Sequence, residues 1–154
     1  FALAAAAKAL PERAQQARSM AVEVRDRLIA DRKHPLAGFH QSNPATAPLQ
    51  SNPHMHLFEA MLAWNEIDPE PTWRALADEI ADLALTRFVH AETGMVREFF
   101  DLDWSPAPGV EGRICEPGHQ FEWGWLLLRW GRLADRPDAT AAEMIAAHQA
   151  GYAA

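Results

Sequence analysis

The chain has 154 residues, 49% of them hydrophobic, which is enough for one ordinary domain with a core of its own. A formal net charge of −7 without any block of Lys and Arg argues against nucleic acid or an anionic membrane surface as the partner. The opening apolar run is too short to span a bilayer, and the single cysteine, Cys115, allows no internal disulfide. We therefore expect a cytoplasmic protein that binds a small or neutral partner.

Both ends of the sequence are typical of a piece of a longer chain. It opens on an alanine-rich run, Phe1 to Ala7, without an initiator Met or a cap, as if partway through a helix. It stops on Gly151 to Ala154 without a clear final element. We expect residues 1–154 to form a single partial domain.

Helical periodicity dominates the first half. Pro11 suits the first turn of a helix, and the apolar spacing after it predicts a helix to about Arg32. The apolar stripe of this helix consists of Ala17, Met20, Ala21, Val24 and Leu28. Asn52 followed by Pro53 is typical of an N-cap and a first helical position, and predicts a helix that runs to about Ile67.

The same rhythm continues to the end of the chain. An apolar stripe between Pro71 and Gly94 predicts another long helix, with residues Trp73, Leu76, Ala77, Ile80, Ala84 and Phe88 on one face. Gly118 opens a helix to about Ala134, and residues 139–149 form a last amphipathic piece. Together with the opening run this makes six helices, arranged as three consecutive helical hairpins.

Two loops are unusually long for a compact helical protein. Residues 33–51 contain three prolines and are expected to hold extended segments, and residues 94–117 are expected to hold a short hairpin. Loops of this length are usually functional or disordered. Both lead directly into helices that begin with histidines, so we interpret them as the rim of an active site.

The first histidine motif is the run from Asn52 to Ala60. His56, Glu59 and Ala60 are spaced to share one helix face, whereas His54 points elsewhere. The second motif is the run from Glu116 to Trp125. Its members that share a face in the first helical turn are His119, Glu122 and Trp123. Each motif therefore places an imidazole and a carboxylate at the start of a helix that follows a long loop.

Structural interpretations compete with functional ones. Glu122 has the position of a capping glutamate, and Glu59 would serve equally well as the partner of a nearby arginine. The tryptophans of the last long helix cannot all face one way, so at least one packs in the core, and Trp123 is the candidate for a sugar-stacking platform. We interpret the remaining histidines as surface or loop residues: His34, His40, His90 and His148.

Metal and nucleophilic chemistry are disfavoured. His54 and His56 are two positions apart, which turns them about 200° from each other on a helix, and no zinc-binding signature is present. Cys115 has no evident activating partner, and no serine lies in a nucleophile motif. We expect no metal and no cofactor.

The two motifs, in this order and some sixty positions apart, resemble the paired motifs of the N-acylglucosamine 2-epimerase superfamily, which includes cellobiose 2-epimerases and mannose isomerases. The resemblance covers the chain from the first long helix onward. It implies an all-α fold, in which about three helical hairpins form the central portion of an (α/α)6 barrel. It also implies a sugar pocket between the helices.

Several residues match the family pattern. The resemblance implies that His119 is an acid/base residue that removes the proton next to the sugar carbonyl to give an enediolate, with Glu122 beside it in the active site. Asn52 and His56 match residues that line the pocket, and Arg113 is a less certain donor to sugar oxygens. The family's second acid/base histidine and an arginine have no match here, so residues 1–154 alone are expected to be inactive.

The residues of the second motif resemble those of mannose isomerases more than those of cellobiose epimerases, which favours a mannose-type aldose-ketose isomerase. A 2-epimerase of the N-acylglucosamine or cellobiose type remains the first alternative, and a non-catalytic helical scaffold or sugar-binding module the second. A neutral monosaccharide is favoured over a phosphosugar, because few basic residues lie near the motifs. The expected partner is a small-molecule sugar, with no nucleic acid and no membrane, and a homodimer is left open.

Overall fold

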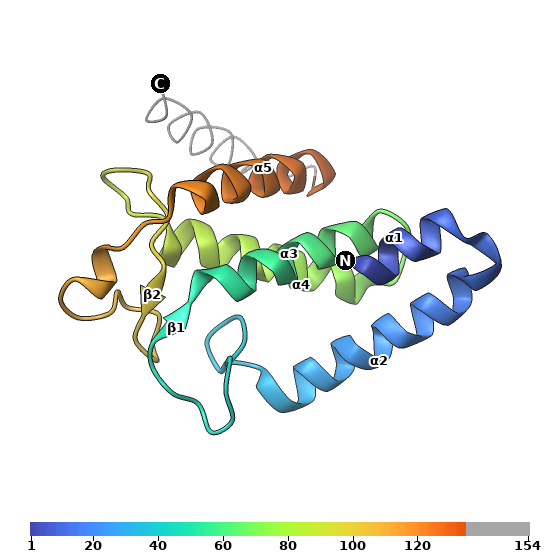
Figure 1. The fold of residues 1–154 in the computed structure, drawn as a ribbon, viewed down its shortest axis with the longest axis horizontal. Coiled ribbons are helices and arrows are strands. Elements are labelled where there is room, and N and C mark those ends of the chain that lie inside the picture. The colour runs from blue at the N-terminus through green and yellow to red at the C-terminus, as the bar shows by residue number, and fades with distance from the viewer. Residues whose placement is uncertain (135–154) are drawn as a thin grey trace.

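A computed structural model describes residues 1–134. Within that range the chain is mostly helical, with five α-helices and one two-stranded sheet. Figure 1 shows that the short connections lie at one end of the helices and the long loops gather at the other, as the sequence predicted. The predicted helix at 139–149, with His148, lies outside the described residues. No described helix is long and apolar enough to cross a membrane.

The first hairpin pairs α1 (Ala2–Ala9) with α2 (Ala14–Arg32), and a 3-10 turn, Pro11–Arg13, joins them. The predicted helix end at Arg32 is confirmed, whereas its first turn is 3-10 rather than α. The predicted apolar stripe of α2 is only partly correct. Ala17 and Ala21 are buried together with Arg25, but Met20 and Val24 are exposed.

The second hairpin pairs α3 (Ser51–Asn65) with α4 (Pro71–Leu83), which continues as a π-helical turn, Ala84–Phe88. All the apolar residues predicted to form the stripe of this second helix are buried. The predicted N-cap of α3 is wrong by two residues. Gln50 holds that position in extended backbone without a side-chain cap bond, and Asn52 lies inside the first turn.

The two long loops meet through a short antiparallel pairing. Strand β1 (Leu49–Gln50) pairs with β2 (Phe99–Phe100), with Leu49 opposite Phe100. The predicted extended segment in the first loop is therefore confirmed, but its partner comes from the second loop. Because β1 runs directly into α3, the pairing fixes the second loop beside the first turn of that helix.

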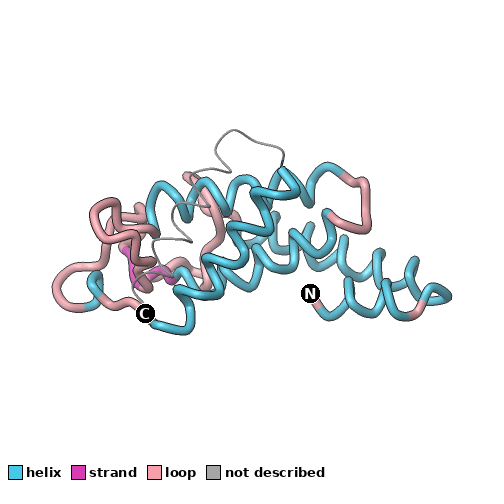
Figure 2. Tube along the Cα trace, turned by 90° about the horizontal axis from the view of Figure 1, so that it is seen from above, coloured by secondary structure: helices cyan, strands magenta, loops and turns pink. Residues whose placement is uncertain are grey.

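The last described helix, α5 (Pro117–Ala134), packs against both α3 and α4. Figure 2 shows the helices lying roughly along one another, with the strands and loops at one end. The core between them is rich in aromatic side chains, including Trp73, Trp104, Trp123, Trp130, Phe58 and Phe88. This packing sets the starts of α3 and α5 next to the joined loops.

Candidate active site

His54 in the first turn of α3 is a structural residue. Its Nε2 accepts a hydrogen bond from the backbone N–H of Phe39 at 3.0 Å, and its Nδ1 lies 3.0 Å from the carbonyl oxygen of Gln50. The ring is buried, and burial is the main reason that its pKa falls to about 4. His54 is therefore neutral near pH 7 and holds the first long loop against α3.

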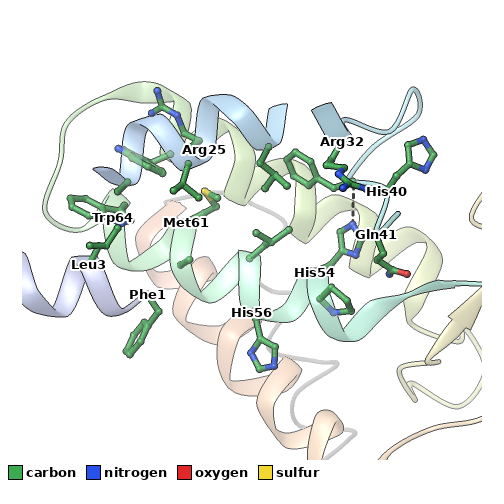
Figure 3. A pocket seen from close by; sticks show the side chains of 18 residues that line it. Phe1, Leu3, Arg25, Arg32, His40, Gln41, His54, His56, Met61 and Trp64 are labelled. Atoms are coloured by element: carbon green, nitrogen blue, oxygen red, sulfur yellow. Dashed lines mark hydrogen bonds between the residues drawn. The ribbon is translucent and has the colours of Figure 1, made fainter. Parts of the chain in front are cut away.

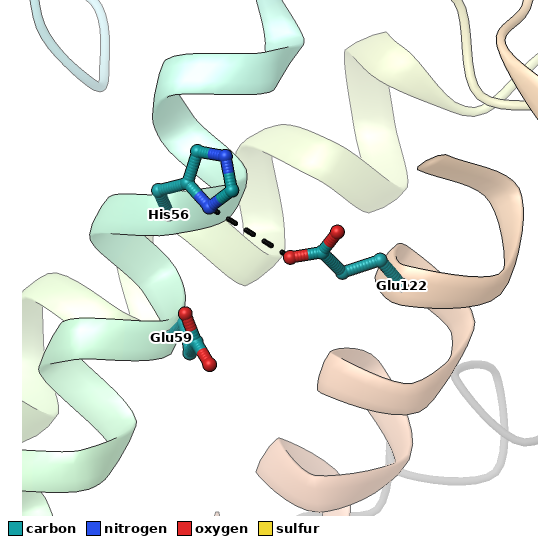
Figure 4. Close-up of side chains that lie close together, drawn as sticks. All are labelled: His56, Glu59 and Glu122. Atoms are coloured by element: carbon teal, nitrogen blue, oxygen red, sulfur yellow. Dashed lines mark ion pairs between the residues drawn. The ribbon is translucent and has the colours of Figure 1, made fainter. Parts of the chain in front are cut away.

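His56 and Glu122 bring the two sequence motifs together. The Nδ1 of His56 lies 3.7 Å from Oε1 of Glu122, across the gap between α3 and α5 (Figure 4). Glu59 lies one turn further along α3, and one ligand-type atom from each of the three residues falls within 4.8 Å of the others. The side chains of His56 and Glu122 are 61% and 35% exposed, so both are accessible to a small molecule.

The imidazole of His119 contacts a carboxylate that the motif did not include. Its Nδ1 lies 3.0 Å from Oε1 of Glu98, immediately before β2. The Glu98 side chain is 5% exposed, whereas that of His119 is 27% exposed. Glu122, which the family resemblance placed beside His119, pairs with His56 instead.

Gln120 fixes the start of α5 to the second loop. Its side-chain Oε1 accepts from the N–H of Val96 at 2.7 Å, and its Nε2 donates to the carbonyl of Val96 at 3.0 Å. The side-chain amide of Gln120 thus bonds both backbone groups of Val96, as a neighbouring β-strand would. Because Gln120 is buried and directly follows His119, the backbone that carries the imidazole is held rigidly.

A groove of about 720 Å³ lies between α1, α2 and α3 (Figure 3). Its lining is mostly apolar, with Leu28 and Met61 among its members, and it reaches His56 near Phe1. Neither His119 nor Glu122 lines it. The groove and the His56–Glu122 pair are therefore neighbours that share His56, and the groove alone does not define the site.

The structure corrects the interpretation of Trp123 as a sugar-stacking platform. Its indole is fully buried, stacked on Phe58 with ring centroids 5.9 Å apart, so it is a core residue and not a platform for a sugar. The expectation that at least one tryptophan of this helix packs in the core is confirmed, because Trp130 is buried as well. Trp125 is the exposed one, with the guanidinium of Arg129 over its ring.

His34 lies in a loop, as predicted, and its side chain is buried there. Its Nε2 lies 2.8 Å from the carbonyl oxygen of Leu102, and its ring packs on Trp104. Burial and the neighbouring His34 lower the pKa of His40.

The remaining predicted site residues differ in placement. Asn52 lies in the first turn of α3, and its buried Oδ1 has no hydrogen-bond partner among the described residues. Arg113 ends a 3-10 turn, Glu111–Arg113, with an exposed side chain that forms no ion pair within residues 1–134. The structure thus brings Glu122 to His56 but does not bring Arg113 into contact with them.

Glu98 is the residue that sequence reasoning missed. It lies in the alternating segment from Met95 to Leu102, where only a short hairpin was expected. A carboxylate between buried Val96 and Phe100 in that alternation was the available signal, because a buried acid requires a partner. Burial, followed by the charge of Glu98, raises the pKa of the Cys115 thiol.

The fold is that of a known helical class. Over 97% of this chain and 42% of the other, the structure superposes with a TM-score of 0.78 on cellobiose 2-epimerase from Bacillus thermoamylovorans B4167, at 16% identity. The described helices thus form part of an (α/α)6 barrel, as predicted. Residues 1–153 match the family described as N-acylglucosamine 2-epimerase, and the chain belongs to that family of sugar isomerases and epimerases.

Two curated relatives are similar in sequence. A protein from Rhizobium meliloti (strain 1021) named mannose-6-phosphate isomerase is 56% identical over 132 residues, which are 84% of this chain and 34% of the relative. A protein from Pseudomonas cannabina pv. alisalensis named D-mannose isomerase is 30% identical over 87 residues, which are 51% of this chain and 21% of the relative. The chain therefore spans about a third or less of the length of these relatives.

Proposed function

We propose that the full-length protein carrying this chain is a mannose-type aldose-ketose isomerase, in which His119 is one acid/base residue. The observation that carries the proposal is the meeting of the two motifs, with Glu122 of α5 3.7 Å from His56 of α3 and His119 one turn before Glu122. The names of the two curated relatives support an isomerase over an epimerase. Residues 1–154 form the central portion of the barrel in this proposal, and they are inactive alone.

The reaction requires only proton transfer. A sugar carbonyl acidifies the neighbouring C–H, so His119 takes the C2 proton while the C–H electron pair forms the enediolate. Return of a proton to C1, with transfer of the O2 hydroxyl proton to O1, gives the ketose. Glu122, His56 and Asn52 bind sugar hydroxyls, because Glu122 approaches His56 between α5 and α3, and Asn52 lies in the first turn of α3. Neither a cofactor nor a metal is needed for these steps.

The substrate is a neutral sugar in this proposal. Within residues 1–134 no lysine or arginine forms a hydrogen bond or an ion pair with His56, His119 or Glu122. A phosphate dianion needs such partners for tight binding. The relatives' names include both a phosphorylated and a free sugar, so the comparison of mannose with mannose-6-phosphate at equal concentration tests this assignment directly.

The test is solvent exchange with the full-length protein in D2O. We expect deuterium at C1 or C2 of the sugar and conversion of aldose to ketose, with a fall of about 10²-fold or more in His119→Gln. His90→Gln is the matched control, since His90 lies in the turn before β2, where its Nδ1 pairs with Thr93, and its loss should leave exchange unchanged. Exchange that survives in His119→Gln refutes the assigned base.

Two other outcomes decide between function classes. Label at C2 with return of a 2-epimer and no ketose would replace the isomerase by a 2-epimerase. Absence of exchange across a panel of aldoses and ketoses in the wild-type protein would favour a non-catalytic scaffold or sugar-binding module.

A further inference from the structure

We propose that Glu98 is the positioning residue for His119, and that its carboxylate sets the ring so that Nε2 is the atom that exchanges protons with the sugar. The inference rests on the proposed function, because it assigns a role relative to the His119 base. It goes beyond that function in naming the partner of the base, the reacting nitrogen and the tautomer.

The contact has the length of an N–H···O hydrogen bond. Nδ1 of His119 and Oε1 of Glu98 are 3.0 Å apart. An ionised carboxylate can only accept, so the hydrogen between them belongs to Nδ1. Glu98 is nearly fully buried and therefore poorly screened by water, whereas the imidazole is partly exposed.

Glu98 is itself fixed at several points. The hydroxyl of Ser51, the first residue of α3, donates to its second carboxylate oxygen, Oε2, at 3.1 Å. Its backbone N–H donates to the carbonyl of Ile114, and its carbonyl accepts from the N–H of Ser51. Glu98 thus joins the first turn of α3, the segment before α5 and the imidazole on α5. A carboxylate held this way orients its partner without reorganising.

The tautomer follows from this contact. With the hydrogen on Nδ1, the neutral ring carries its free lone pair on Nε2, which is the lone pair that accepts the sugar C2 proton. When that proton arrives, the ring becomes an imidazolium, and Glu98 faces the new positive charge directly. The proton then leaves from Nε2 to C1 of the enediolate. Glu98 accepts the Nδ1 hydrogen bond throughout and transfers no proton, the role an acid plays behind a catalytic histidine.

Glu122 does not offer this arrangement. Its carboxylate lies on the His56 side at 3.7 Å and is 35% exposed, which makes it a weaker and more solvated partner. Glu98 is closer to its histidine and has its other oxygen occupied by Ser51. In this proposal Glu122 binds the sugar, whereas Glu98 orients the base His119.

The first experiment observes the tautomer in the unmodified full-length protein. Histidine labelled with 15N gives distinct nitrogen shifts for the two neutral tautomers, and the His119 signals are identified by their loss in His119→Gln. At a pH high enough to leave the ring neutral, we expect Nδ1–H with an unprotonated Nε2. The opposite tautomer overturns the inference, whatever the activity of the protein.

The second experiment compares Glu98→Gln with Glu92→Gln, an exposed glutamate on the same loop that loses the same charge. We expect kcat to fall about 10²-fold or more in Glu98→Gln with KM changed little, and the His119 tautomers to become mixed. Glu92→Gln should match the wild type in both. Unchanged kcat and tautomer in folded Glu98→Gln overturn the inference.

Failure of the two proposals can be told apart. If His119→Gln keeps its activity, the base assignment fails, yet the tautomer of the wild-type ring still reports whether Glu98 holds it. If His119→Gln is inactive while Glu98→Gln is fully active, only the positioning role fails. Should Glu98→Gln not fold, the wild-type tautomer decides, and Ser51→Ala, which removes only the bond to Oε2, should lower kcat by a smaller factor.

Discussion

The starts of α3 and α5 each present a histidine, but the two rings are used in opposite ways. His54 has both nitrogens bonded to backbone groups, from Phe39 and Gln50, and is buried. His119 has one nitrogen on the Glu98 carboxylate and a partly exposed ring. A histidine whose two nitrogens are both occupied by backbone can only hold structure, whereas one nitrogen left over permits proton transfer.

The largest effects should come from replacing each of the two histidines in turn and comparing turnover with stability. His119→Asn should reduce turnover of the full-length protein about 10²-fold to 10⁴-fold while leaving its thermal unfolding close to the wild type. His54→Asn should do the reverse, because the buried backbone N–H of Phe39 loses its hydrogen-bond partner, which costs about 1–3 kcal/mol. Turnover per folded molecule and denaturant unfolding measure both; equal behaviour of the two variants would remove the distinction.

The pH dependence of stability should show the same contrast. Burial lowers the pKa of His54 to about 4, so above pH 6.5 the ring is neutral in both states and its contribution is fully present. As pH falls from 6.5 to 4, the unfolded chain takes up a proton that the folded ring refuses, and up to about 3 kcal/mol of stability is lost.

Unfolding free energies measured in urea across that interval test this expectation. The difference between wild type and His54→Asn cancels the groups that titrate alike in both variants, and it contains the smaller effects of His34, Lys33 and Glu79 on the ring. A difference that does not change with pH would contradict a neutral buried His54.

Substitutions at three glycines should give smaller and graded losses of stability. A Cβ at Gly38 (φ +74°) would lie 2.7 Å from Nε2 of His54, so Gly38→Ala should cost about 2 kcal/mol or more through both strain and the clash. Gly109 (φ +71°) has nothing within 4 Å, and Gly109→Ala carries the strain alone. Gly118 at the start of α5 is open as well, so Gly118→Ala should be tolerated. Unfolding midpoints of the three variants should follow that order.

The smallest expected effect concerns metal. His56, Glu59 and Glu122 have the donor atoms of a divalent cation site within 4.8 Å of one another. Because proton transfer by His119 needs no such ion, exhaustive dialysis of the full-length protein against a chelator should leave turnover unchanged. Loss of turnover that added Mn²⁺ or Mg²⁺ restores would move the site toward metal-assisted chemistry.

The sequence predicted the helices well because their signals are local. Pro11, Pro71 and the apolar spacing between Trp73 and Phe88 depend on neighbours within a few turns, and the described helices agree with them. The motif residues His56, His119 and Glu122 were also visible, since a spacing of three or four residues places side chains on a common face.

Contacts between distant segments were not predictable in the same way. The face of Trp123 depends on Phe58, which lies in another helix, so its burial in the core could not be read from the spacing within α5. The pairing of β1 with β2 joins two loops about fifty residues apart, and nothing within either loop identifies its partner. Glu98 was missed for this reason, since both of its side-chain partners lie in other elements.

The pairing of β1 with β2 also bears on the order in which the molecule forms. The helices gain hydrogen bonds among near neighbours, whereas the bond between Ser51 and Glu98 closes a span of 47 residues and that between Glu98 and His119 a further 21. Such long-range contacts should form after the helices, because the entropy of closing the loop is lost before the contact can stabilise the chain. During refolding, recovered helicity should therefore precede recovered turnover, and the interval between them times the arrival of the second loop at the start of α3.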